Sequence, residues 1–265
     1  MGDRLVQLRR GCGGGGHAPE VSSTRRVTLI LLPGLDGTDI FFRPLLAALP
    51  PWIEAHCVEY PVSGPNDYRD LLPLVRNACQ ACEEFFLLGW SFSGPLALML
   101  AAESPAALRG VVLCASFISP PWPFIRALRL AATASVARFL PFVSRALALF
   151  GRYSSDDFVR DRAECWSRVP PSALAARARA VLAVDLRSRL ACGVPLLYIR
   201  GSKDIIVPPW NARAVANAIP AARVVTIDGP HLALYTNAAA AADVIVDFMR
   251  QGTPGRRFDA ASPGA

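Results

Sequence analysis

Residues 85–98 decide the expected fold, and they read Phe85-Phe86-Leu87-Leu88-Gly89-Trp90-Ser91-Phe92-Ser93-Gly94-Pro95-Leu96-Ala97-Leu98. The apolar run at the start is too short for a helix and fits a strand that is buried on both faces. The residues after Ser91 are small and compatible with a helix, and Pro95 lies near its first turn. The stretch therefore predicts a buried strand that turns sharply into a helix, with Ser91 at the tip of the turn.

A serine at such a turn is typical of a nucleophile elbow, in which strained backbone exposes the hydroxyl at the end of the strand. Gly89 and Ser93 lie two residues to either side of Ser91, where a bulky side chain would collide with the neighbouring strand and helix. The usual pattern has glycine in place of Ser93, and here Gly94 follows directly. The alternative is an ordinary strand-to-helix turn that contains serine by chance, so the interpretation depends on the rest of the chain.

The composition of the 265-residue chain is that of a folded domain with a full core. Apolar residues make up 52% and charged residues 18%, which excludes a disordered chain. The 28 basic residues outnumber the 21 acidic ones, and all but Lys203 are arginines. The sequence contains no pattern typical of a nucleic-acid-binding module. We therefore expect no nucleic-acid partner, despite the excess of basic residues.

Seven cysteines form an odd and scattered set, which predicts reduced thiols in a cytoplasmic protein. Cys79 and Cys82 form a CxxC pair, but neither a second pair nor a nearby histidine completes a zinc site. We therefore expect no metal site. The two ends of the chain, residues 1–25 and 251–265, are expected to be a disordered leader and a disordered tail.

Strand-like and helix-like segments alternate through most of the chain. Besides the strand before Ser91, strands are expected at residues 26–32, 53–59, 110–115, 195–200 and 223–227. This alternation predicts an α/β fold with a mainly parallel sheet that is covered by helices on both faces. The expected core consists of two blocks, residues 26–118 and 190–250.

The segment between these blocks, residues 119–189, lacks strand-like runs and has apolar residues at helical spacing. We expect a helical cap inserted over the strand ends, where ligands bind in such sheets. An apolar stretch at 127–150 is interrupted by three arginines and a proline, so we expect no transmembrane span. The segment holds twelve arginines against five acids, which could attract an acidic acyl carrier or could simply be solvated. The oligomeric state stays open.

A serine hydroxyl is a poor nucleophile at neutral pH and needs an adjacent base, normally a histidine that a carboxylate orients. Of the three histidines, His17 lies in the glycine-rich leader. His56 lies inside an expected strand, where a buried structural role is expected. His231 lies just past the last strand, at the sheet edge where Ser91 is also expected. His231 is therefore the expected base.

The expected carboxylate is Asp204, in the loop after the strand that precedes the last one. Its rival is Asp228, which lies only three residues before His231. The chain order Ser91, Asp204, His231 favours Asp204, because the order serine, acid, histidine is that of one known fold. Asp204 could alternatively cap the helix that follows it.

Residues 26–250 resemble an α/β-hydrolase. Four features occur in the order of that family: the turn at Pro33-Gly34, the elbow around Ser91, the Gly201-x-x-Asp204 turn, and Gly229-Pro230-His231. The family's usual His-Gly is here Pro33-Gly34. The resemblance implies an oxyanion hole formed by the backbone N–H groups of Leu35 and Phe92.

The resemblance also implies a serine hydrolase that cleaves esters or thioesters of small or acyl-chain substrates through an acyl-enzyme, with no cofactor. An acyltransferase or an acyl-carrier thioesterase on the same fold is an alternative. A non-catalytic ligand-binding protein is another, although the presence of all three catalytic residue types counts against it. Aromatic side chains could line an apolar pocket: Trp90, the candidate substrate contact, and Phe41, Phe42, Phe92, Trp122 and Phe124.

Overall fold

The computed structural model describes residues 26–124, 133–138, 155–188 and 190–253. The expected leader, nearly all of the expected tail, and most of the apolar stretch at 127–150 lie outside these ranges. Within them, no helix combines the length and the apolar character that a membrane crossing requires.

Six strands form one sheet in the order β2-β1-β3-β4-β5-β6, and every neighbouring pair is parallel. The strands are β1 (Val27–Leu32), β2 (Ile53–Cys57), β3 (Phe85–Trp90), β4 (Leu108–Cys114), β5 (Leu196–Gly201) and β6 (Arg223–Ile227). Every residue of the central strand β3 is buried, as the unbroken apolar run predicts. The expected α/β fold with a parallel sheet is confirmed.

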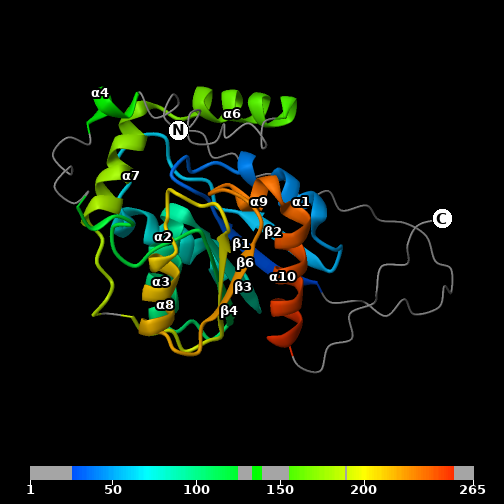
Figure 1. Ribbon diagram of the computed structural model, residues 1–265. Helices are drawn as coiled ribbons and strands as arrows, with labels where there is room; N and C mark the ends of the chain where they lie inside the picture. Colours follow the sequence, from blue (N-terminus) through cyan, green and yellow to red (C-terminus); the bar gives the residue numbers. More distant parts are fainter. Residues whose placement is uncertain (1–25, 125–132, 139–154, 189, 254–265) are drawn as a thin grey trace, which may run out of the picture.

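Helices cover both faces of the sheet (Figure 1). One face packs against α2 (Tyr68–Gln80), α3 (Gly94–Ala102) and α8 (Trp210–Ala218), and the other against α1 (Arg43–Ala48) and α10 (Ala238–Gln251). Alternate residues of β3 serve the two cores: Phe85 and Leu87 face the first, and Phe86 and Leu88 the second. The elbow serine therefore follows a strand that is fixed from both sides.

The beginning of α2 is set by Asp67, its N-terminal capping residue. The Asp67 carboxylate accepts hydrogen bonds from the N–H groups of Arg69 and Asp70, and Asp70 bonds back to the Asp67 N–H. This reciprocal cap satisfies donors that the first turn would otherwise leave unpaired.

The expected buried role of His56 is wrong, and the helical segment after β6 is divided into α9 (Ala233–Thr236) and α10. Asn237, at the junction, has non-helical backbone and donates to the Asp228 carbonyl at 2.9 Å. His56 is exposed and lies 3.3 Å from Glu54, because β2 is an edge strand whose side chains alternate between core and solvent.

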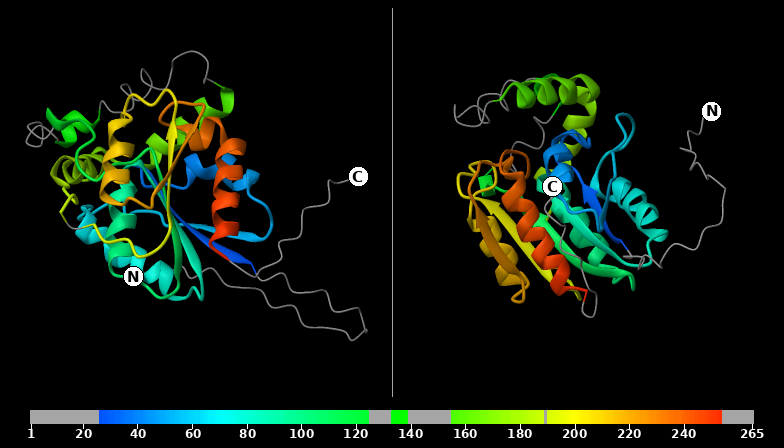
Figure 2. Two further views of the ribbon diagram at one scale, coloured as in Figure 1. Left: turned by 60° about the horizontal axis from the view of Figure 1, so that its bottom comes forward. Right: turned by 90° about the vertical axis from the view of Figure 1, so that its right-hand side faces the viewer.

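The described part of the expected cap segment contains the helices α4 (Ala134–Ala137), α6 (Asp156–Arg168) and α7 (Pro171–Ala183). Helix α6 contacts the short 3-10 helix η1 (Ile40–Phe42), which follows β1, so α6 lies at the carboxyl end of the sheet. Figure 2 shows α6 crossing above the sheet. The division into a core and a separate cap domain stays a prediction.

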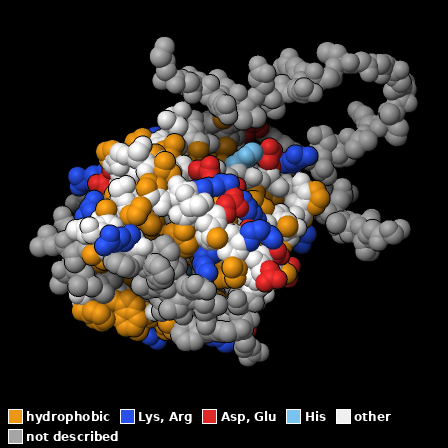
Figure 3. All heavy atoms as spheres, turned by 90° about the horizontal axis from the view of Figure 1, so that it is seen from above, with side chains coloured by type: hydrophobic (Ala, Val, Ile, Leu, Met, Phe, Trp, Pro, Cys, Tyr) orange, Lys and Arg blue, Asp and Glu red, His pale blue; other side chains and the backbone are white. Residues whose placement is uncertain are grey.

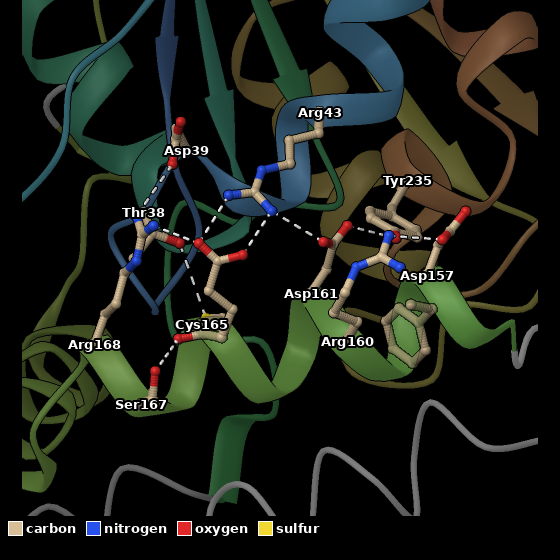
Figure 4. A network of polar contacts seen from close by, with 12 residues as sticks. Thr38, Asp39, Arg43, Asp157, Arg160, Asp161, Cys165, Ser167, Arg168 and Tyr235 are labelled. Atoms are coloured by element: carbon tan, nitrogen blue, oxygen red, sulfur yellow. Dashed lines mark hydrogen bonds and ion pairs between the residues drawn. The ribbon is translucent and has the colours of Figure 1, made fainter.

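Helix α6 buries Phe158 and Cys165 in the core and is also held by charged side chains (Figure 4). Arg43 of α1 donates to Asp161 at 3.0 Å and to Glu164 at 2.7 Å. The Tyr235 hydroxyl of α9 donates to the other oxygen of Asp161 at 2.8 Å. Seen from above, basic and acidic side chains are interspersed on this face (Figure 3). Arg160, for example, pairs with Asp157 at 2.6 Å.

Candidate active site

Ser91 lies immediately after β3, in the 3-10 helix η2 (Ser91–Ser93). Its φ of +49° places it in the left-handed region, which non-glycine residues rarely adopt. The turn also requires a small residue at position 89, because a Cβ on Gly89 would lie 2.6 Å from the Ser93 carbonyl oxygen. The strained serine expected at the tip of the turn is therefore present.

The glycine at position 94 has a specific packing reason. A Cβ there would lie 1.8 Å from the Ser116 Oγ, which donates a hydrogen bond to the Ser91 carbonyl at 2.6 Å. Ser116 thus occupies the space that glycine leaves, and it fixes the backbone of the candidate nucleophile.

Ser93, which replaces the usual glycine, is fully buried. Its hydroxyl donates to the Pro33 carbonyl and accepts from the Tyr60 hydroxyl, whose oxygen is 2.5 Å away. The substitution therefore ties the elbow to the loop after β1. The sequence shows that position 93 departs from the pattern, but it does not show which groups the hydroxyl reaches.

His231 joins Ser91 to Asp204. Its Nε2 is 2.9 Å from the Ser91 Oγ, and its Nδ1 is 2.9 Å from the Asp204 Oδ2. The other carboxylate oxygen accepts from the N–H groups of Ile206 and Val207, each at 2.9 Å. The side chains of His231 and Asp204 are 14% and 2% exposed. With the proton on Nδ1 directed at Asp204, Nε2 can accept the proton of the Ser91 hydroxyl.

The rival carboxylate, Asp228, is directed elsewhere. Its Oδ1 accepts from the Lys203 ammonium at 2.6 Å and from the Ser202 hydroxyl at 2.8 Å, and its side chain is 66% exposed. Asp228 therefore ties the two loops after β5 and β6 to each other, while Asp204 is the carboxylate in contact with His231.

The two expected oxyanion donors lie in firmly held backbone. The Phe92 carbonyl accepts from the Tyr68 hydroxyl at 2.9 Å, and the two rings stack with centroids 4.8 Å apart. Leu35 lies in the loop after β1, and its carbonyl accepts from Arg177 of α7 at 3.0 Å. The sequence did not single out Arg177, because it is one of many arginines in its segment. Burial lowers the pKa of Arg177 below the ordinary arginine value.

The aromatic residues grouped as pocket candidates lie in different environments. Trp90 is 2% exposed and packs against Phe41 and Phe42, at centroid distances of 6.3 and 5.5 Å. Its indole N–H has no hydrogen-bond partner in the described parts of the chain. Phe124, by contrast, is 71% exposed, and it lies beside the half-buried Trp122. The substrate contact assigned to Trp90 stays a prediction.

Cys79 and Cys82 are both free thiols, at the end of α2 and just beyond it. Burial raises the pKa of Cys79 to about 12, so it is protonated at neutral pH. The described residues contain no group of three or more histidine, cysteine or acidic side chains that is suited to a metal ion.

Residues 29–244 match the Alpha/beta hydrolase family. A Pimeloyl-(acyl-carrier protein) methyl ester esterase from Xanthomonas campestris pv. campestris is 30% identical over 236 residues, which cover 81% of this chain and 88% of that protein. The esterase of the same name from Yersinia enterocolitica is 28% identical over 247 residues, covering 84% and 93%. The crystal structure of the enol-lactonase from Burkholderia xenovorans matches with a TM-score of 0.69 and 23% identity, covering 84% of this chain and 91% of that one.

Proposed function

Because the chain belongs to the alpha/beta hydrolase family and is a hydrolase of the esterase type, we propose that it cleaves carboxylic esters with Ser91 as nucleophile, His231 as base and Asp204 as orienting carboxylate. The observation that carries this proposal is the pair of 2.9 Å hydrogen bonds that joins Ser91 through His231 to Asp204. These side chains come from loops after three different strands, and together they form the proton-transfer chain that a serine nucleophile needs.

In the first half of the reaction, His231 Nε2 takes the proton of Ser91 while Oγ attacks the carbonyl carbon of the ester. The N–H groups of Leu35 and Phe92 donate to the oxygen that becomes negative, and Asp204 stabilises the imidazolium. The imidazolium then gives its proton to the leaving alcohol. The acyl group stays on Ser91 as an ester.

In the second half, a water molecule takes the place of the alcohol. His231 removes a proton from the water as its oxygen attacks the acyl carbon, and a second oxyanion forms at the same backbone donors. Return of the proton to Ser91 releases the carboxylic acid. Every proton in this cycle moves through His231, and no step calls for a metal or an organic cofactor.

We further propose that the substrate is an ester of an acyl chain, with an ester carried on an acidic acyl carrier protein as the specific candidate. The relatives from Xanthomonas and Yersinia support this choice, since both are named as esterases of an acyl-carrier-protein methyl ester. The basic residues of the segment between β4 and β5 are compatible with an acidic partner, although Arg160 and Arg187 pair with acids of this chain.

The test is a panel of substrates: p-nitrophenyl esters of graded chain length, methyl esters of acyl chains on acyl carrier protein, and coenzyme A thioesters. We expect hydrolysis of the oxygen esters that is lost in Ser91→Ala and kept in Ser167→Ala, which alters an exposed serine of α6. Faster turnover of the thioesters, or transfer to an added alcohol, would instead indicate a thioesterase or an acyltransferase. Folded protein that turns over none of them would indicate a binding protein.

A further inference from the structure

Arg177 is fully buried, although it belongs to the arginine-rich segment between β4 and β5. A buried guanidinium is strongly unfavourable unless its N–H groups are satisfied. Arg177 donates through Nη1 to the carbonyls of Leu35 and Asp36 at 3.0 and 2.6 Å. It also donates through Nη2 to the Pro61 carbonyl at 2.8 Å, and through Nε to the Asn66 Oδ1 at 2.9 Å. One side chain of α7 therefore holds the backbone of two loops.

The first of these loops, residues 33–37, has each of its carbonyl oxygens engaged. From residue 33 to residue 37 the donors are, in order, the Ser93 hydroxyl, the Gly37 N–H, Arg177 for both Leu35 and Asp36, and the Tyr60 N–H. In a trans peptide unit the C=O and N–H groups point in opposite directions. Holding the carbonyls therefore fixes where the N–H groups of this loop point.

The Leu35 N–H is left available by this arrangement. In the part of the chain that the structure describes, it donates to no other group. The carbonyl on the same peptide unit, that of Gly34, accepts from the Gly37 N–H at 3.1 Å, which prevents the unit from rotating freely. An available and fixed donor is what an oxyanion hole requires.

The loop is also shaped around the guanidinium. Gly37 has φ +72°, and a Cβ there would lie 2.5 Å from Arg177 Nη1 and 2.9 Å from the Tyr60 Cβ. The Arg177 guanidinium carbon lies 5.5 Å from the centroid of the Tyr60 ring, within the range of a cation–π contact. The absence of a side chain at position 37 lets the guanidinium reach the backbone.

We propose that Arg177 is a positioning residue for the oxyanion hole. Its buried guanidinium holds the Asp36 carbonyl, whose peptide unit also carries the Gly37 N–H. Because that N–H bonds to the Gly34 carbonyl, Arg177 keeps the Gly34–Leu35 peptide unit in place and the Leu35 N–H directed at the reacting carbonyl of the ester. Through this one residue, helix α7 supports the loop at residues 33–37. This inference rests on the proposed function, since it concerns a step of the same reaction.

The test compares Arg177→Met, which removes all five donors, with Arg179→Met, which alters an exposed arginine two residues further along the same helix. For Arg177→Met we expect kcat for a p-nitrophenyl ester to fall by about 100-fold, as on loss of one oxyanion donor, with KM nearly unchanged. The inhibition constant of a trifluoromethyl ketone should rise by the same factor, because its adduct carries the oxyanion. Arg179→Met should leave both constants at wild-type values.

Arg177→Lys provides a milder variant if Arg177→Met does not fold, because lysine keeps the charge and the stem but lacks the planar fork of donors. Its kcat should fall by about tenfold, since fewer carbonyls are held. Circular dichroism is used to establish whether each variant is folded. Titration with a fluorophosphonate is used to count the reactive sites. A folded variant with wild-type kcat would overturn the inference, and so would a lower kcat with unchanged inhibition by the ketone. If Ser91→Ala keeps its turnover, the proposed function itself fails.

Discussion

The two halves of the candidate site are held in different ways. His231 contacts both Ser91 and Asp204 directly, and each of the three contributes a functional side chain. The loop at residues 33–37 contributes only backbone, and that backbone is held from outside by Arg177 and Ser93. The first half therefore depends on the chemical identity of its residues, whereas the second depends on its supports. Substitutions should abolish activity in the first half and reduce it by degrees in the second.

The largest effects are expected at the first half. Ser91→Ala and His231→Ala should each lower kcat/KM by about five to six powers of ten, because each removes a participant in the same proton transfer. Asp204→Asn should lose somewhat less. The double variant Ser91→Ala/His231→Ala should be little worse than either single variant, as measured with a p-nitrophenyl ester. Additive losses would mean that the two side chains do not act together.

Next in size is the packing that supports the serine. Gly94→Ala places a Cβ 1.8 Å from the Ser116 Oγ, so the turn must shift. We expect a loss of about 1–3 kcal/mol in the free energy of unfolding, as overpacked cores show, together with a large loss of kcat. Gly94→Ala/Ser116→Gly should recover part of the stability in urea unfolding. Wild-type stability in Gly94→Ala would contradict the contact.

A smaller loss of kcat is expected at Ser93. Ser93→Ala leaves the Pro33 carbonyl and the Tyr60 hydroxyl buried without their partner, which should cost about 1–3 kcal/mol. Since Pro33 begins the loop at residues 33–37, which carries the Leu35 N–H, kcat should also fall by about tenfold. This is a fraction of the loss expected for one missing oxyanion donor. Tyr60→Phe, which leaves the bond between Ser93 and Pro33 in place, should lose less.

The control for this comparison is Thr253→Val, which removes a buried hydroxyl that donates to the Met249 carbonyl at 2.9 Å, beyond the end of α10. It should lower the melting temperature but leave kcat unchanged. Equal loss of kcat in Thr253→Val and Ser93→Ala would show that the effect of Ser93 is general destabilisation.

The smallest effect is expected where α6 is attached. Arg43→Met removes the ion pairs to Asp161 and Glu164. The Arg43 side chain is 39% exposed. Because such pairs are screened by solvent and salt, the melting temperature should fall only slightly, and the difference from wild type should shrink at about 0.5 M salt. The value of kcat should stay close to wild type. A loss as large as that of Arg177→Met would mean that α6 and α7 support the site equally.

The fold could be predicted from the sequence, and so could the proximity of Ser91, His231 and Asp204, for reasons that lie in particular residues. The buried run before Ser91 predicts one structure, and His231 is the only one of the three histidines that lies just past a strand of the expected sheet. Arg177 could not be identified in this way, since its burial depends on how α7 packs against two distant loops. His56 was misjudged because the edge position of β2 arises from the strand order, which local sequence does not encode.

The central claim is that Ser91 is an activated nucleophile, and a fluorophosphonate probe tests it most directly. The probe reacts with a serine whose hydroxyl is activated by a neighbouring base. We therefore expect one adduct per chain, which peptide mass spectrometry should locate on Ser91. Labelling should disappear in Ser91→Ala and become far slower in His231→Ala. Folded wild-type protein that stays unlabelled, or an adduct on a different residue, would contradict the claim.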